Sequence, residues 1–126
     1  MPEPKKNGKK ILVVDDEPQV CEAIGMLLSF DGHEVVSANG GKEALALFAR
    51  HKFDLVITDY TMPGMTGDDL ALELKTRLPG QPVIMITAFA EDLKRSGVSL
   101  TGVDQLVSKP FQFQDLRDAV QKATAR

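Results

Sequence analysis

The segment LVITDYTMPGMTG, residues 55–67, decides the fold of this chain. An apolar, partly β-branched run ends at a single carboxylate, Asp59, and the turn residues Pro63 and Gly64 follow closely. This pattern is typical of a buried parallel strand that delivers one charged group to the edge of a sheet. A carboxylate at the end of a strand is common, and an isolated one is more often a loop residue that caps the next helix.

Three more strand-like runs end in polar side chains in the same way. Residues 11–14 run into Asp15 and Asp16, residues 83–86 into Thr87, and residues 106–108 into Lys109. The carboxyl ends of parallel strands lie on one edge of an open doubly wound sheet, where ligands bind. The sequence therefore predicts that three acids, a hydroxyl and an ammonium converge at this edge, with Asp59 as the candidate reactive residue.

Strand-like and helix-like segments alternate along nearly the whole chain. We expect strands at residues 10–14, 34–38, 55–59, 83–87 and 105–108, helices at residues 18–30, 42–49, 67–78 and 112–123, and a short or distorted helix within residues 91–102. This alternation predicts an α/β fold, with a five-stranded parallel sheet covered by helices on both faces and joined by right-handed crossovers. Of the two common strand orders, 2-1-3-4-5 places the first and third strands side by side. That order would bring Asp15, Asp16 and Asp59 within contact range.

Length and composition fit one globular domain. The 126 residues are 43% hydrophobic, and we divide them into a flexible arm, residues 1–9, and one domain, residues 10–126. No apolar run approaches the roughly 18 residues that span a bilayer, and no signal-peptide core follows the charged start MPEPKKNGKK. We therefore expect a cytoplasmic protein without a membrane partner. The net charge of -3, with no basic stripe, argues against nucleic acid as a partner.

The remaining candidate nucleophiles and ligands have ordinary explanations. The single cysteine, Cys21, falls within a helical pattern, where a packed thiol is far more common than a catalytic one. His33 and His51 lie at element boundaries without another Cys or His at ligand spacing, and we interpret them as solvated turn residues.

The predicted acidic cluster needs a compensating charge. Two carboxylates about 5 Å apart repel each other by roughly 3 kcal/mol at an effective dielectric constant of about 20. Oxygen ligands select a hard cation, and Mg2+ usually takes one or two carboxylates, several waters and a phosphate oxygen. Lys109 adds a charge that pairs with Asp59 or with an incoming phosphoryl oxygen, and Thr87 adds a hydroxyl donor. This combination suits phosphoryl transfer with Asp59 as the nucleophile toward phosphorus.

Four motifs, in order, resemble the receiver domains of two-component response regulators, which accept a phosphoryl group from a sensor histidine kinase. The motifs are VVDDEP, ITDYTMPGMTG, MITAF and SKPF, and the resemblance covers residues 10–124. It implies a flavodoxin-like, three-layer fold and phosphorylation at Asp59. It also implies a Mg2+ ion held by Asp15, Asp16, Asp59 and the backbone carbonyl of Thr61.

The same resemblance implies roles for other residues and for partners. Thr87 and Lys109 would contact the phosphoryl group, and the bond between Lys109 and Pro110 is a candidate for a cis peptide. The donor would be a sensor histidine kinase or a phosphotransfer protein. The domain would catalyse only its own phosphoryl uptake and loss, and would contact an effector or a second copy through residues 88–124.

The chain departs from the family pattern at Leu106, where the fifth strand usually carries a Tyr, Phe or His that swings inward as the threonine moves. A leucine lacks a polar tip and costs more to expose. We therefore expect Leu106 to stay mostly buried and the signal to pass through residues 88–102.

Two other functions fit parts of the pattern. A receiver-like fold that only binds a partner would need no phosphorylation, but the intact set of acids, hydroxyl and lysine favours phosphorylation. A flavin-binding module of the same topology would need a loop of small and hydroxyl residues to cradle phosphate after the first strand. The chain reads DDEPQ there, and neither GxGxxG nor the P-loop pattern occurs in it.

Overall fold

The structure alternates strands and helices as the sequence predicts. It is a computed structural model that describes residues 8–96 and 100–125, so the expected arm, residues 1–9, falls almost wholly outside the described residues. The strands are β1 (Lys10–Val14), β2 (Glu34–Ala38), β3 (Leu55–Asp59), β4 (Val83–Thr87) and β5 (Gln105–Ser108). The helices are α1 (Pro18–Phe30), α2 (Gly41–Arg50), α3 (Gly67–Arg77), α4 (Ala90–Ser96) and α5 (Phe113–Thr124).

The strands form one parallel sheet in the order β2-β1-β3-β4-β5, which confirms the predicted fold class and topology. The register places Val14 of β1 beside Thr58 of β3, so the residues that follow these strands emerge next to each other. Thr87 of β4 pairs with Ser108 of β5 in the same way. All five carboxyl ends therefore lie on one edge, as in other doubly wound sheets.

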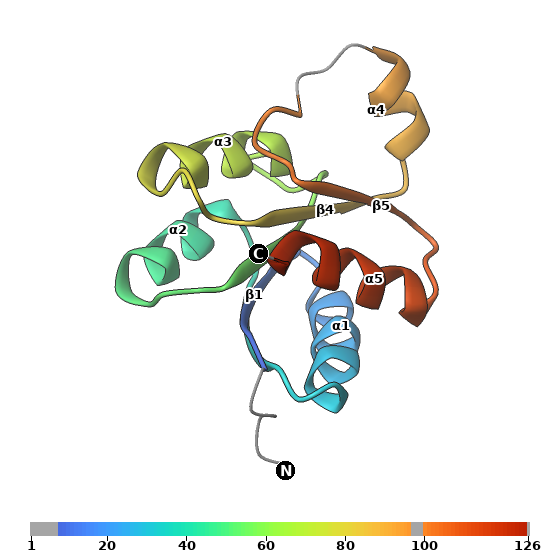
Figure 1. Cartoon of the computed structure of the whole chain (residues 1–126). Coiled ribbons are helices and arrows are strands. Elements are labelled where there is room, and N and C mark those ends of the chain that lie inside the picture. Colours follow the sequence, from blue (N-terminus) through green and yellow to red (C-terminus); the bar gives the residue numbers. More distant parts are fainter. Residues whose placement is uncertain (1–7, 97–99, 126) are drawn as a thin grey trace.

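Helices cover both faces of the sheet (Figure 1). Ile11 and Val13 of β1 belong to an apolar cluster that also includes residues of α1 and α5. Leu12 and Val14, the alternate residues of the same strand, belong to a second cluster with residues of α2 and α3. Because successive side chains of a strand point to opposite faces, a strand buried on both faces must be apolar throughout. This explains why β1, β3 and β4 read as continuous hydrophobic runs.

The helix boundaries follow local signals. Pro18 occupies the first turn of α1, where its missing N–H costs no hydrogen bond. At the start of α5, the Asp115 carboxylate accepts a hydrogen bond of 3.0 Å from the backbone N–H of Gln112. Both signals come from residues at the helix ends themselves, so these two helix starts do not depend on contacts with distant parts of the chain.

The boundaries differ from the expected ones in small ways. α2 begins and ends one residue beyond the expected range, and α3 ends at Arg77 because Leu78 takes an extended conformation. The short helix expected within residues 91–102 is α4, which begins one residue earlier, at Ala90, and ends at Ser96, while residues 97–99 lie outside the described residues. Gly102 is required for packing, because a Cβ there would come within 2.8 Å of the backbone of Ala71.

Within the described ranges, no helix combines the length and the apolar character needed to cross a membrane.

Candidate functional site

Three carboxylates meet at the carboxyl edge of the sheet, where β1 and β3 lie side by side. Asp15 and Asp16 follow β1 and Asp59 ends β3, and one carboxylate oxygen from each lies within 4.8 Å of the others. The Asp15 side chain is only 3% exposed and that of Asp59 14% exposed, whereas Asp16 is open to solvent. The predicted convergence of the three acids is therefore observed.

Lys109 supplies the one ammonium that lies among these acids in the described residues. Its Nζ lies 3.4 Å from Oδ1 of Asp59 and 3.6 Å from Oδ2 of Asp15. The backbone N–H of Lys109 donates to the carbonyl of Thr87, which ties the end of β5 to that of β4. The peptide bond between Lys109 and Pro110 is cis, as the resemblance implied.

The acids carry more negative charge than Lys109 can balance. Burial raises the pKa of Asp15, and the neighbouring charges of Asp59 and Asp16 raise it further, while the backbone N–H of Glu17 and the ammonium of Lys109 lower it. The N–H of Glu17 donates to Oδ1 of Asp15 at 2.9 Å. Burial is the main reason that the pKa is raised in spite of these two partners, and three carboxylates face a single ammonium. A hard divalent cation would supply further positive charge.

Thr87 lies at the end of β4 and is 1% exposed. Its Oγ1 accepts a hydrogen bond of 3.1 Å from the backbone N–H of Phe89. The hydroxyl hydrogen can still be donated to another acceptor, because this bond uses only an oxygen lone pair. Phe89 itself is 51% exposed. The contact links the edge of the site to the start of α4.

Backbone groups that sequence patterns do not reveal also hold Asp59. The N–H of Tyr60 donates to Oδ1 of Asp59 at 2.9 Å. The N–H of Gly67 donates to the carbonyl of Tyr60 at 2.8 Å, so the loop folds back onto the start of α3. A Cβ at position 67 would lie 2.2 Å from the backbone oxygen of Asp59. The glycine that ends the motif MPGMTG is therefore a requirement of close packing, and Gly64, with φ +84, turns the same loop.

The two remaining predicted positions are Thr61 and Leu106. Thr61 is exposed and lies two residues after Asp59 in the loop. Its backbone carbonyl is the group predicted to bind Mg2+. Leu106 is half-buried on β5, beside Met85 of β4. That Leu106 stays mostly buried in both signalling states remains a prediction.

The single cysteine and the histidines do not form part of the site. Cys21 is buried, with Sγ 3.5 Å from the carbonyl of Asp15, and burial raises the pKa of the thiol, with the charge of Asp15 as the next cause. It is a packed thiol, as predicted. His51 is exposed, but the interpretation of His33 as a solvated turn residue is wrong: it is half-buried, and its Nδ1 accepts a hydrogen bond from the N–H of Lys9.

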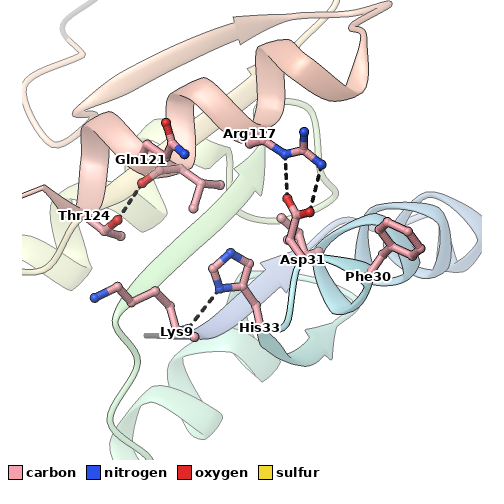
Figure 2. Close-up of a pocket in the computed structure, with 10 residues that line it drawn as sticks. Lys9, Phe30, Asp31, His33, Arg117, Gln121 and Thr124 are labelled. Carbon is pink, nitrogen blue, oxygen red and sulfur yellow. Dashed lines mark hydrogen bonds and ion pairs between the residues drawn. The ribbon is translucent and has the colours of Figure 1, made fainter. Parts of the chain in front are cut away.

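His33 lines a cavity of about 660 Å³ at the opposite edge of the sheet, away from the acids. Figure 2 shows the guanidinium of Arg117 pointing toward the carboxylate of Asp31. Arg117 of α5 makes a two-pronged ion pair with Asp31, through Nε and Nη2 at 2.8 Å each. The cavity thus holds an internal ion pair, and the chemistry of the predicted site has no counterpart in it.

The fold and the acidic cluster together define a doubly wound α/β domain with an acidic site at its switch point. The family model for the response regulator receiver domain matches residues 11–121, and the chain belongs to this family. Receiver domains are signalling modules rather than conventional enzymes.

Relatives and solved structures agree with this assignment. The probable transcriptional regulatory protein TcrX of Mycobacterium tuberculosis is 35% identical over 106 residues, which cover 84% of this chain and 45% of TcrX. The response regulator protein FleR of Pseudomonas aeruginosa is 39% identical over 112 residues, which cover 88% of this chain and 24% of FleR. The response regulator protein TrrA of Thermotoga maritima, solved in complex with Mg2+ and BeF, aligns with a TM-score of 0.84 and 38% identity over 91% of this chain and 98% of that one. The chain therefore spans half or less of these two curated relatives.

Proposed function

We propose that this domain accepts a phosphoryl group on Asp59 in a Mg2+-dependent reaction and changes conformation in response. The main observation behind this proposal is that one carboxylate oxygen from each of three acids lies within 4.8 Å of the others, with Nζ of Lys109 3.4 Å from Oδ1 of Asp59. Phosphoryl transfer depends mainly on positioning and on neutralising charge, and this site has groups for both. The related structure with bound Mg2+ and BeF supports the proposal.

The residues of the cluster fit Mg2+ rather than a softer metal. The donors are carboxylate oxygens, and burial is the main cause of the raised pKa of Asp15, with the charges of Asp59 and Asp16 as further causes. Asp15, Asp16 and Asp59, with the backbone carbonyl of Thr61, would hold the ion. When bound, it would neutralise the negative charge between the acids and an incoming phosphoryl group.

Asp59 is the nucleophile in this proposal. Its Oδ1 is held by the N–H of Tyr60 and the ammonium of Lys109, so we assign the attack to Oδ2. A bond forms between Oδ2 and phosphorus as the bond from phosphorus to the donor's imidazole nitrogen breaks, and the imidazole leaves with that electron pair. Lys109 would then move its charge to a phosphoryl oxygen, and Thr87 would donate its hydroxyl hydrogen to another.

The phosphodonor would be a sensor histidine kinase or a phosphotransfer protein. A groove of about 620 Å³ runs beside Lys109 between α1 and the turn from β5 to α5. Its lining includes the apolar side chains of Val20, Ala23, Leu27 and Phe111. A partner helix lying in this groove could present a phosphohistidine to the acids next to it.

Three further statements belong to the same proposal. The protein is cytoplasmic, and it controls an effector or a second copy through residues 88–124. It also catalyses its own dephosphorylation.

Intact-mass spectrometry with Mg2+ and acetyl phosphate tests the proposal. The parent chain should gain one phosphoryl group, Asp59→Asn should gain none, and Asp16→Asn should react more slowly with weaker Mg2+ binding. Asp92→Asn, an exposed acid of α4, is the matched control and should react like the parent. Equal labelling of Asp59→Asn and the parent would show that the acceptor is another residue. No labelling of the parent would favour the second candidate, a receiver-like module that binds a partner without phosphorylation.

A further inference from the structure

The outer edge of β2 is open, and its backbone groups are arranged in a self-complementary way. The N–H of Glu34 donates to the carbonyl of Lys9, and the N–H of Asp15 donates to the carbonyl of Ala38. Residues 34, 36 and 38 therefore direct their backbone groups toward β1. Since these directions alternate along a strand, Val35 and Ser37 direct theirs away from the sheet, where the strand order leaves β2 without a neighbour.

An apolar surface on α1 lies beside this open edge. Phe30 is 80% exposed and Met26 68% exposed, the highest values among the large hydrophobic side chains of the described residues. Both line a groove of about 440 Å³ together with Val35 and Ser37 of β2. Glu22 is the only charged residue among those that line it. A soluble domain rarely leaves an aromatic ring this exposed beside an open strand edge without a partner.

We propose that β2 pairs with β2 of a second copy across a two-fold axis at Val36, joining the two sheets into one. In this antiparallel register residue 35 of each copy lies opposite residue 37 of the other, and these are the two residues whose backbone groups point outward. The backbones can thus exchange four hydrogen bonds without disturbing the pairing of β1 with β2. Two copies related in this way share one self-complementary interface.

The side chains are compatible with the same register. Glu34, the one charged residue of β2, lies opposite Ala38 of the second copy, so no like charges face each other. A two-fold axis perpendicular to the sheet leaves each face of the sheet on the same side in both copies. Val35 packs against the cluster that includes residues of α1, so α1 of both copies lies on the face that carries the Val35 side chains. Met26 and Phe30 of each copy would then cover the paired β2 strands from that face.

The contact is small, so the dimer should be weak. Burying the five residues of β2, Met26 and Phe30 from each copy would remove on the order of 1,000 Å² in total, the lower limit for a specific interface. We therefore expect a Kd on the order of 10 to 100 μM. This inference does not rest on phosphorylation, and Asp59→Asn should dimerise like the parent.

Analytical ultracentrifugation across this concentration range, without phosphodonor, is the first test. Phe30→Glu should weaken dimerisation at least about tenfold, because it places one carboxylate from each copy in the interface between the two β2 strands and their α1 helices. Leu78→Glu adds the same charge at another exposed hydrophobic residue, after α3, and should have no effect. A parent chain that stays monomeric throughout, or a dimer that Phe30→Glu leaves intact, would overturn the proposal; the latter result would point to another face such as residues 88–124.

Cysteine cross-linking tests the register in a Cys21→Ala background. Val36→Cys should form an intermolecular disulfide on mild oxidation, because residue 36 lies opposite itself in a pair without hydrogen bonds, where side chains approach most closely. Glu34→Cys should not, since the two copies of residue 34 would be separated by four residues of strand, about 13 Å. Efficient cross-linking at position 34 with none at position 36 would contradict the register.

Discussion

Replacing Asp15 by Asn should stabilise the metal-free fold at neutral pH. The Asp15 side chain is 3% exposed and has a carboxylate oxygen within 4.8 Å of Asp59. At an effective dielectric constant of about 20, this repulsion is roughly 3 to 4 kcal/mol, and the attraction to Lys109 at 3.6 Å is of similar size. The two nearly cancel, so the cost of burying the charge remains. We expect the free energy of unfolding to rise by about 1 to 2 kcal/mol, since the amide oxygen of Asn can still accept the N–H of Glu17.

The pH dependence has a definite sign. The pKa of Asp15 is raised above the ordinary value of 3.8, so between these two values the folded state binds more protons than the unfolded state. Stability therefore falls as pH rises through the folded-state pKa, and the full cost of the charge is present above it. The advantage of Asp15→Asn should be complete at neutral pH and should disappear as the pH falls toward 3.8.

Urea unfolding in EDTA, followed by circular dichroism, measures the difference. Mg2+ should reverse the order of stability, because an ion at about 100 times its Kd stabilises the parent by roughly 2.7 kcal/mol and the variant by much less. Asp92→Asn should unfold like the parent under all these conditions. A loss of stability for Asp15→Asn in EDTA at neutral pH, or a gain that persists unchanged at acid pH, would refute the reasoning.

Three further predictions concern metal binding, the loop and signalling. Lys109→Ala should leave the Mg2+ affinity within a few-fold of the parent or tighten it, because a competing cation is lost; a large loss in a Mg2+ titration would contradict this role. Gly67→Ala should destabilise the fold by about 2 to 3 kcal/mol through its clash with the backbone of Asp59, whereas Gly80→Ala, where a Cβ meets nothing within 4 Å, should be nearly neutral in thermal unfolding. Beryllofluoride should change hydrogen exchange most in residues 88–102, of which 97–99 lie outside the described residues; a larger change on β5, with residues 88–102 indifferent, would show that Leu106 performs the aromatic residue's role.

The strand order and the convergence of the acids were predictable because few topologies suit alternating strands and helices. Continuous apolar runs indicate strands buried on both faces, and parallel strands place their carboxyl ends on one edge. The polar residue after each run, such as Asp59 or Lys109, then belongs to one site. Side-chain chemistry and spacing were enough for this step.

The contacts that hold the site could not be predicted in the same way. The N–H groups of Tyr60 and Glu17 carry no sequence signal, because every residue but proline has one and only the loop geometry directs it. The environment of His33 depends on Lys9, which lies 24 positions away in the chain. The short helix expected within residues 91–102 is α4, but its regularity and its end at Ser96 were not predicted, because the glycines and β-branched residues after it obscure the helical pattern.

The bond between Thr87 and Phe89 favours a route for the signal from Asp59 to α4. Since Thr87 accepts the N–H of Phe89 at 3.1 Å, movement of its hydroxyl toward a phosphoryl oxygen must either carry the start of this loop with it or break the bond. Either outcome changes the position or mobility of α4, a helix of only 7 residues with two buried side chains. Leu106 has no polar link to the site and can respond only through packing. We therefore expect α4, which is short and is linked to Thr87 through Phe89, to respond first, and we expect a domain of this sequence to switch without an aromatic residue on β5.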